Sequence, residues 1–264
     1  MIYISDSLVL GTPESTGVPL THSRIGYTSI ARGLTPVASS SVAGFPASNA
    51  NSFTTYEYWR PVSTPATWGI DAGDLKEADY VGIVGEIQGR SIALEFSVDN
   101  ITWLPAIEFI AESRVVMGLF ERRGARYWRV RFEGAVPNVA VIFIGVALAM
   151  QRPIYVGHTP VTLSRTTETT TNVSDRGQYL GRSIVRTGVS TSAEFQHLRS
   201  DWYRSNFDPF VKAARVQPFF FAWRPSTFPR EVGYVWTEDD IRPSNTGPRD
   251  FMSVSFSFKG IGVD

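Results

Sequence analysis

Apolar and polar residues alternate along much of this chain, which predicts β-strands rather than helices. Residues 92–97 alternate an aliphatic or aromatic residue with a small or polar one and are followed by a turn at 99–100. Residues 252–258 alternate apolar residues with serines in the same way. The most apolar run, residues 139–150, is too short for a membrane span and predicts a buried strand. The pattern therefore predicts an all-β protein.

One stretch departs from this alternation and favours a helix. Residues 191–194 read Thr-Ser-Ala-Glu, the pattern of a capping box at a helix N-terminus. Phe195, Leu198 and Trp202 then follow at helical spacing. We expect a single helix over residues 192–204.

A threonine-rich segment is the least ordinary part of the chain. Residues 164–172 favour a strand, yet neither of their alternating faces is apolar. A second extended run at 179–189 follows a turn at 174–177, which predicts a long hairpin, with a flexible polar loop as the alternative. An isolated hairpin is marginal in water and its edges can pair with other chains. The hypothesis is an assembly arm, ordered in an oligomer, that contains Thr166, Thr167, Thr169, Thr170 and Thr171.

Composition narrows the functional classes. Basic and acidic residues balance at 25 each in 264 residues, so charge gives no case for nucleic acid or for an anionic membrane. The absence of cysteine removes disulfides, thiolate nucleophiles and thiolate zinc sites. The first residues lack a basic segment followed by an apolar one, so we expect no signal peptide and synthesis in the cytoplasm without membrane insertion.

No residue pattern indicates catalysis. His22, His158 and His197 lie far apart in the sequence without a metal-ligand partner at helical or hairpin spacing. We therefore predict no catalytic residues, no metal, no cofactor and no enzymatic activity. Arg129 and Arg131 share one face of a predicted strand, which favours a solvated face, with a phosphate or sulfate site as the alternative.

The N-terminal half carries an ordered series of motifs. Residues 38–103 contain ASS, ASNA, PATWGIDAG and FSVDNITW, and residues 125–131 read ARYWRVR. Over roughly 28–150 this series resembles the discoidin domains of the galactose-binding-like superfamily. The resemblance implies an eight-stranded jelly-roll sandwich whose end loops bind sugars or lipids, although the disulfide frequent in that family is absent here.

Three aromatic residues fall in the loop region that corresponds to the ligand loops of that family. Phe53, Tyr56 and Tyr58 are the candidate ligand-binding residues, since aromatic rings stack on sugar faces. The alternative interpretation is that these rings pack the loop onto the sandwich.

The C-terminal region carries a second resemblance. Over roughly 190–262, a predicted helix is followed by FFFAWRP, VGYVW and MSVSFSFKGI. This order resembles the closing region of bacteriophage tail-tip and baseplate proteins. The resemblance implies a structural protein that forms a homo-oligomeric ring, and we expect three or six copies in that ring. It also implies that the protein binds other tail proteins and resides in the virion after assembly in the host cytoplasm.

These observations predict three segments. Residues 1–23 form a strand and loop that pair with the C-terminal domain, residues 24–152 form a jelly roll that folds alone, and residues 153–264 form a β-rich assembly domain. The main hypothesis for function is a phage tail-tip or baseplate subunit that displays the jelly roll, with a host surface glycan as a further partner. The alternative is a carbohydrate-binding protein outside any virion.

Overall fold

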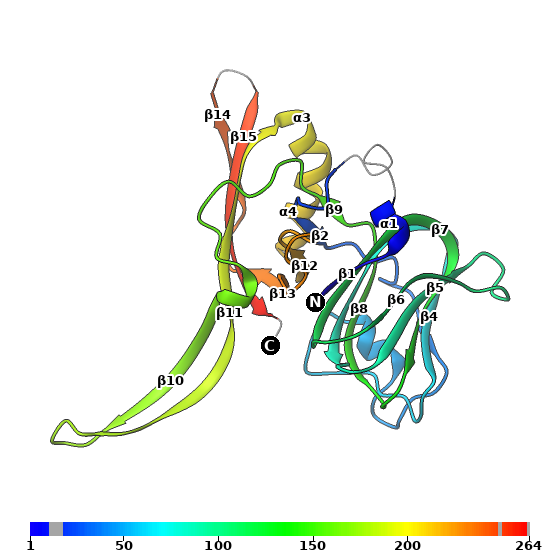
Figure 1. Cartoon of the computed structure of the whole chain (residues 1–264), viewed down its shortest axis with the longest axis horizontal. Coiled ribbons are helices and arrows are strands. Elements are labelled where there is room, and N and C mark those ends of the chain that lie inside the picture. The colour runs from blue at the N-terminus through cyan, green and yellow to red at the C-terminus, as the bar shows by residue number, and fades with distance from the viewer. Residues whose placement is uncertain (11–17, 248–249, 263–264) are drawn as a thin grey trace.

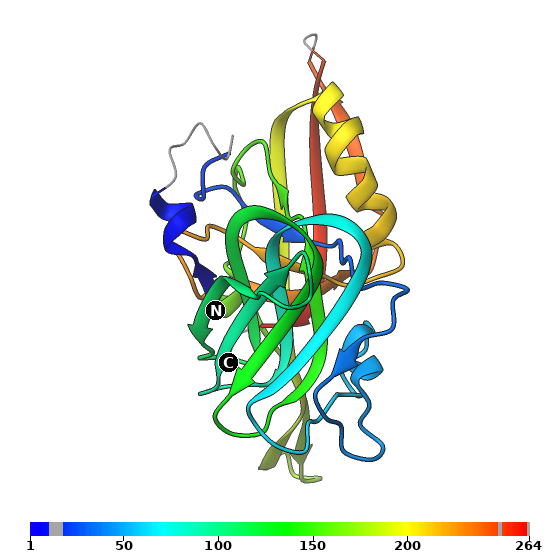
Figure 2. The ribbon, with the colours of Figure 1, turned by 90° about the vertical axis from the view of Figure 1, so that its right-hand side faces the viewer.

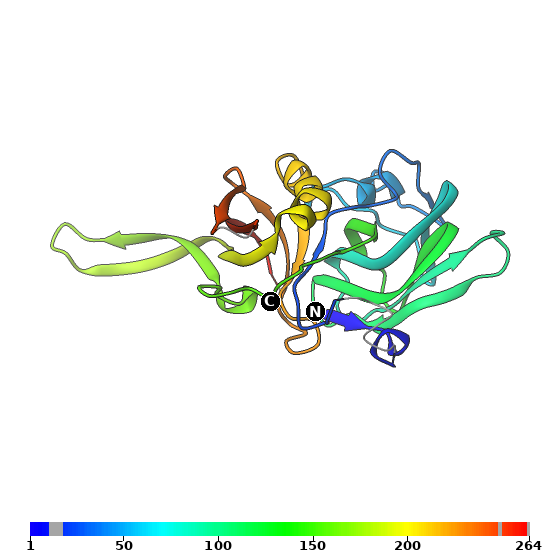
Figure 3. The same ribbon diagram turned by 90° about the horizontal axis from the view of Figure 1, so that it is seen from above.

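The chain folds into two β units, which confirms the predicted all-β class (Figure 1). The computed structural model describes residues 1–10, 18–247 and 250–262. One unit is a sandwich built from a seven-stranded sheet, and the other is an eight-stranded sheet with a helical segment and a long projecting hairpin. The sandwich and the hairpin lie at opposite ends of the longest axis of the molecule (Figures 1 and 3).

The first sheet contains seven strands in the order β3-β4-β7-β5-β6, with β1 beside β7 and β8 beside β4. These strands are β1 (Ile2–Ile4), β3 (Val37–Ala38), β4 (Ala66–Glu86), β5 (Ser91–Ser97), β6 (Leu104–Ile110), β7 (Val115–Glu133) and β8 (Asn138–Gly145). The predicted hairpin around residues 99–100 is confirmed as β5 and β6. A short α1 (Asp6–Leu10) follows β1, and a 3₁₀ turn, η1 (Ala47–Asn51), precedes β4.

Two long strands make this sheet a sandwich. The register between β4 and β7 shifts between Asp71 and Lys76, where both strands bend, as Figure 2 shows in cyan and green. The first half of β4 and the second half of β7 form one layer with β3, β5 and β6. The remaining halves form the second layer with β1 and β8. Two layers that face each other in this way enclose a core.

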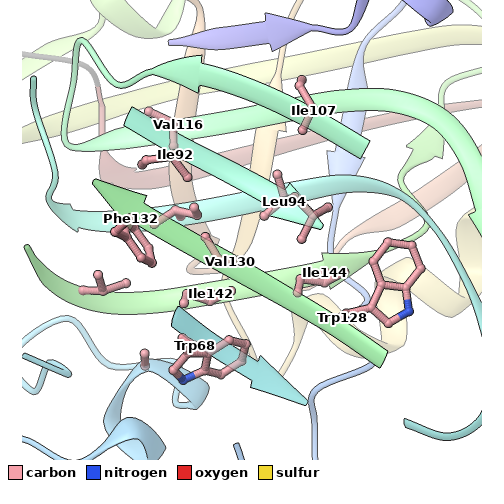
Figure 4. Packing of buried hydrophobic residues seen from close by; sticks show 14 of the residues in the cluster. Trp68, Ile92, Leu94, Ile107, Val116, Trp128, Val130, Phe132, Ile142 and Ile144 are labelled. Atoms are coloured by element: carbon pink, nitrogen blue, oxygen red, sulfur yellow. The ribbon is translucent and has the colours of Figure 1, made fainter. Parts of the chain in front are cut away.

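The core of the sandwich consists of side chains from both layers (Figure 4). Trp68, Trp128 and Val130 belong to the first layer, and Val116 and Ile142 belong to the second. All five are fully shielded from solvent. Trp128 and Val130 alternate with Arg129 and Arg131 along β7, which places the two apolar side chains on the inner face.

The second sheet runs in the order β10-β11-β15-β13-β12-β2-β9, with β14 beside β15. Its strands are β2 (Arg24–Gly26), β9 (Leu148–Ala149), β10 (Arg165–Val173), β11 (Tyr179–Arg199), β12 (Phe219–Ala222), β13 (Val232–Thr237), β14 (Arg242–Thr246) and β15 (Phe251–Ile261). A 3₁₀ turn, η2 (Val161–Leu163), precedes β10. A continuous helical segment, formed by α3 (Ser200–Trp202), the π-helical η3 (Tyr203–Phe207) and α4 (Asp208–Ala214), contributes Phe207 and Phe210 to the second hydrophobic core beside this sheet.

The sandwich is inserted into the second unit. The predicted jelly roll of residues 24–152 includes β2 and β9. These two strands pair with each other, and β2 also pairs with β12 of the second sheet. The chain therefore leaves the second sheet after β2 and returns at the neighbouring strand β9. The predicted limits of residues 24–152 are too wide because these short strands take their partners from tertiary packing.

The two units share a buried apolar interface. Tyr80 and Phe143, on the outer face of the second layer, pack with Phe220 and Tyr234 of the second sheet, and all four are at most 1% exposed. Gly82 makes this close approach achievable, because a Cβ at that position would lie 2.5 Å from the ring of Phe220. The sandwich is thus held to the second sheet by core-like packing.

The predicted helix over residues 192–204 is wrong at both ends, because the helical segment extends from Ser200 to Ala214. β11 continues as a strand to Arg199, and the helical segment begins at Ser200. Residues Ala193 and Phe195 pair with Phe256 and Val254 of β15. The segment also satisfies period-two alternation, and this pairing buries Ala193 and Phe195 completely, which overrides the local capping pattern.

The first strand also differs from its prediction. We expected residues 1–23 to pair with the C-terminal domain, but β1 runs parallel to β7 of the sandwich, with Ile2 beside Met117. One contact to the other unit remains, since the backbone N–H of Ile2 donates a hydrogen bond to the carbonyl of Pro229. Residues 11–17 of the predicted loop lie outside the described residues.

Candidate functional site

The threonine-rich segment forms the projecting hairpin that the sequence predicts. β10 and the first half of β11 pair antiparallel from Arg165 opposite Val189 to Val173 opposite Tyr179. We call residues 165–188 the arm. Its turn is closed by a hydrogen bond from the Gly177 N–H to the Ser174 carbonyl (2.8 Å) and by one from the Gln178 N–H to Ser174 Oγ (3.0 Å). The alternative of a flexible polar loop is not what the structure shows.

The arm is exposed along its length. Of the five threonines proposed for it, Thr166, Thr167, Thr170 and Thr171 are exposed and Thr169 is half-buried. Among the described residues, no strand other than β11 pairs with β10, and β15 joins β11 only from Val189 onward. Both outer edges of the arm therefore present backbone groups to solvent.

At the base of the arm, the edge of β11 is covered by the segment that returns from the sandwich. The Tyr155 N–H donates to the Glu194 carbonyl (2.9 Å), and the Ser190 N–H donates to the Ser164 carbonyl (2.9 Å). His158 Nδ1 lies 2.8 Å from the Ser192 carbonyl, and burial lowers the pKa of this imidazole. From Arg165 onward β10 occupies this same edge of β11, and the opposite edge of β11 becomes free where its pairing with β15 ends at Val189.

The three candidate ligand residues of the sandwich have different environments. The Arg32 guanidinium lies 3.4 Å above the ring of Phe53, whose carbonyl accepts a hydrogen bond from the Tyr234 hydroxyl (2.8 Å). Tyr58 stacks on Phe45 with ring centroids 4.6 Å apart. Both residues pack the loop onto the molecule.

Only Tyr56 among these three presents most of its side chain to solvent, at 77% exposure. It lies on the loop between η1 and β4, next to exposed Glu57. The alternative interpretation from the sequence, a packing role for the loop aromatics, therefore describes Phe53 and Tyr58. Tyr56 is the one of the three whose side chain is mostly exposed.

The two-arginine face of β7 is occupied by carboxylates. Arg129 Nε lies 2.5 Å from Glu95, and Arg131 Nε lies 3.1 Å from the same carboxylate. The carboxylates of Glu133 and Glu108 also contact Arg131. Because these guanidinium groups are already neutralised, an additional phosphate or sulfate would displace existing ion pairs. The geometry favours the interpretation as a solvated, ion-paired face.

The described residues contain no cluster of three or more His, Asp or Glu side chains that could hold a metal ion. His22 contacts the Met150 carbonyl through Nδ1 (3.0 Å), and His158 and His197 lie elsewhere. None of the described helices has the length and apolar character needed to cross a membrane.

The solved structures that are similar to this chain cover less than half of it. No family model and no curated protein matches the chain. A chitosan-binding module from a Paenibacillus chitosanase/glucanase is 20% identical, with 44% of this chain and 97% of that chain covered at a TM-score of 0.40. The protein CpGH89CBM32-6 of Clostridium perfringens is 16% identical, with coverages of 44% and 97% and a TM-score of 0.39. A Ruminococcus gnavus GH29 fucosidase is 18% identical, with coverages of 47% and 27% and a TM-score of 0.41.

These likenesses are too distant to assign a ligand to this chain. The first module is named for carbohydrate binding, which is the alternative hypothesis of the sequence analysis rather than its main one. The tail-tip hypothesis has no counterpart in these comparisons and stays a prediction. Fold and geometry define a two-unit β protein with an inserted jelly roll and a projecting arm.

Proposed function

We propose that this chain is a structural subunit that associates with further copies of itself through the arm and displays the jelly roll. The observation that supports this most directly is the arm itself, a two-stranded ribbon with free outer edges that extends away from both cores (Figure 1). Such a ribbon gains little by burial in its own chain, and free edges are templates for pairing with another chain. Its position opposite the sandwich leaves the jelly roll accessible after assembly (Figure 3).

The setting that we propose is a bacteriophage tail tip or baseplate, in which the copies form a ring and contact other tail proteins. This rests on the resemblance of residues 190–262 to the closing region of such proteins. In that setting the protein resides in the virion after assembly in the host cytoplasm. A ring of three or six copies is the proposed form.

Removal of the arm is expected to abolish self-association and leave the monomer folded. Thr166 and Gly188 are register partners, so an Asn-Gly turn can replace residues 167–187 without altering β15 or the cores. Light scattering after size exclusion should show assemblies for the full chain across a concentration series and monomers for the variant. Circular dichroism checks that the variant keeps its β spectrum.

The control replaces the charges of the turn, Asp175→Asn with Arg176→Gln, and keeps the arm; it should assemble as the full chain does. Persistence of assemblies in the variant without the arm, or a full chain that is monomeric at every concentration, would contradict the proposal.

A second candidate function is carbohydrate binding by the displayed sandwich. The observation in its favour is Tyr56, a ring that is largely exposed on a loop whose neighbouring aromatics are fixed by packing. Because the neighbouring rings pack the loop onto the molecule, less of the loop has to be ordered on binding, which lowers the entropic cost. This function is compatible with assembly, because the arm and the loop lie on different units.

Calorimetric titration with oligomers of galactose and of N-acetylglucosamine tests this candidate. If Tyr56 stacks on a sugar, Tyr56→Ala should weaken binding by about tenfold or more, since loss of about 1.4 kcal/mol corresponds to a factor of ten. Val62→Ala, a change at another exposed residue before β4, serves as the control and should have no effect. Equal affinities for the full chain and Tyr56→Ala, or no heat with any probe, would count against it.

A further inference from the structure

The two faces of the arm differ in character, which the sequence of β10 alone does not reveal. Side chains directly opposite each other in an antiparallel pair lie on the same face. Thr169 is opposite Ile184, and Val173 is opposite Tyr179. The face that contains these residues we call the docking face; it consists of Thr167, Thr169, Thr171, Val173, Tyr179, Arg182, Ile184 and Thr187.

The opposite face of the arm is polar. Glu168 is paired with Arg186, and their charged groups form an ion pair at 2.5 Å. Thr170 is opposite Ser183 on this face, and Asn172 is opposite a glycine. The register-paired residues of this face carry no aliphatic or aromatic side chain. Leu180 and Val185, which are 65% and 61% exposed, lie at the two register shifts of β11 and have no partner on β10.

The docking face continues the buried face of the second sheet. Along β11, every second residue after Thr187 points to the core beside the helical segment, and Val189, Ala193 and Phe195 are buried there. Ile184 lies on the same face of the same strand but is 66% exposed, and Tyr179 is equally exposed. The apolar face therefore extends along the arm beyond the elements that cover it in its own chain.

The net charge of the arm indicates which partner covers the docking face. Residues 165–186 carry four arginines and two acidic residues, whereas the whole chain is balanced at 25 basic and 25 acidic residues. The arm therefore has a net charge of +2, and the rest of the chain has a net charge of −2. The net charge of the arm is opposite in sign to that of the rest of a second copy, and opposite charges favour such an encounter.

We propose that the docking face of the arm packs against the body of a second copy of this chain, while the polar face remains in solvent. The proposal rests on the self-association proposed above and adds to it the face and the partner. From Thr167 to Val173 this face runs for roughly 20 Å, at about 3.3 Å per residue, which is the length of an ordinary strand. A strand or sheet face of the partner therefore matches it in size.

Neighbouring positions on β11 supply a matched test. Ile184→Asp places a charge on the docking face, and Ser183→Asp places the same charge on the polar face one residue away. Both side chains are exposed, so neither change should disturb the fold of the monomer. Sedimentation equilibrium on the full chain should show association weakened by about tenfold or more for Ile184→Asp, because a carboxylate must then be desolvated, and by less than about threefold for Ser183→Asp.

The results separate this inference from the proposed function. Equal loss of association in both variants would mean that the arm docks by its edges, which overturns the face assignment although arm deletion still abolishes assembly. Assembly that survives arm deletion overturns both. Association should also weaken when NaCl is raised from low concentration to 0.5 M, since ions screen exposed charges. If salt has no effect, or if nuclease treatment abolishes assembly, the partner of the docking face is not a second copy held by opposite charge.

Discussion

A fragment of residues 24–152 is expected to aggregate or to remain without fixed tertiary structure when expressed alone. The sequence predicts that this fragment folds independently, but the structure places an apolar interface on its outer face. Val84, Met117 and Val141 are at most 3% exposed and share a buried cluster with Phe220 and Tyr234 of the second sheet. Cutting the chain would expose these side chains together with Phe143, and a contiguous apolar patch of this kind promotes association.

The measurement is a thermal melt followed by tryptophan fluorescence, with binding of a hydrophobic dye as the second readout. The full chain should unfold in one cooperative transition because the two units share a core, whereas the fragment should bind dye strongly and melt without a sharp transition. A control fragment, residues 27–147, removes β2 and β9 and, like the first fragment, lacks β1. It should behave as poorly, since loss of the covering elements and not of β2 and β9 decides the outcome. A cooperative melt for either fragment would show that the sandwich is autonomous.

The inserted arrangement of the sandwich could not be read from the sequence for a physical reason. β2 and β9 contain three and two residues, and their pairing with each other joins positions that are more than 120 residues apart. Such short strands have no pattern of their own, and packing against the second sheet selects their partners. The short strand at residues 92–97 was predictable because its alternation is regular, whereas the full lengths of β4 and β7 were not, because both strands continue through polar residues at their bends.

The arm shows which part of a candidate site a sequence does reveal. The threonine run predicts an extended ribbon with no core, and the structure confirms the hairpin. The face of the arm depends on a bulge between Glu168 and Thr169, which sets Ile184 rather than Val185 opposite Thr169. A bulge changes which residues share a face, and the sequence of β11 contains no local pattern that predicts the position of this bulge.

The aromatic loop illustrates a different limit. Phe53, Tyr56 and Tyr58 are indistinguishable in the sequence, yet one ring lies under a guanidinium, one is exposed and one stacks on Phe45. Arg32 is distant in the chain, and its position over Phe53 follows only from the packed loop. The sequence therefore identifies the loop, and tertiary contacts decide which residue remains available to a ligand.

Trp68→Ala is expected to lower the free energy of unfolding by about 3–5 kcal/mol, the range for truncation of a buried aromatic residue. The indole of Trp68 is fully buried in the core of the sandwich (Figure 4). Its Nε1–H donates a hydrogen bond to the Ala47 carbonyl at 2.9 Å, so the change also leaves that carbonyl without its partner. Urea denaturation followed by circular dichroism measures the loss.

Trp103→Ala provides the comparison and should cost much less. Trp103 is half-buried beneath the guanidinium of Arg129, which lies 4.0 Å from the ring centroid. Loss of a cation–π contact at an exposed site costs about 0.5–1 kcal/mol, and Tyr56→Ala should cost less still because its ring has little contact to lose. Equal losses for Trp68→Ala and Trp103→Ala would show that the β5–β6 turn carries as much of the stability as the core, and the packing described for the sandwich would then be wrong.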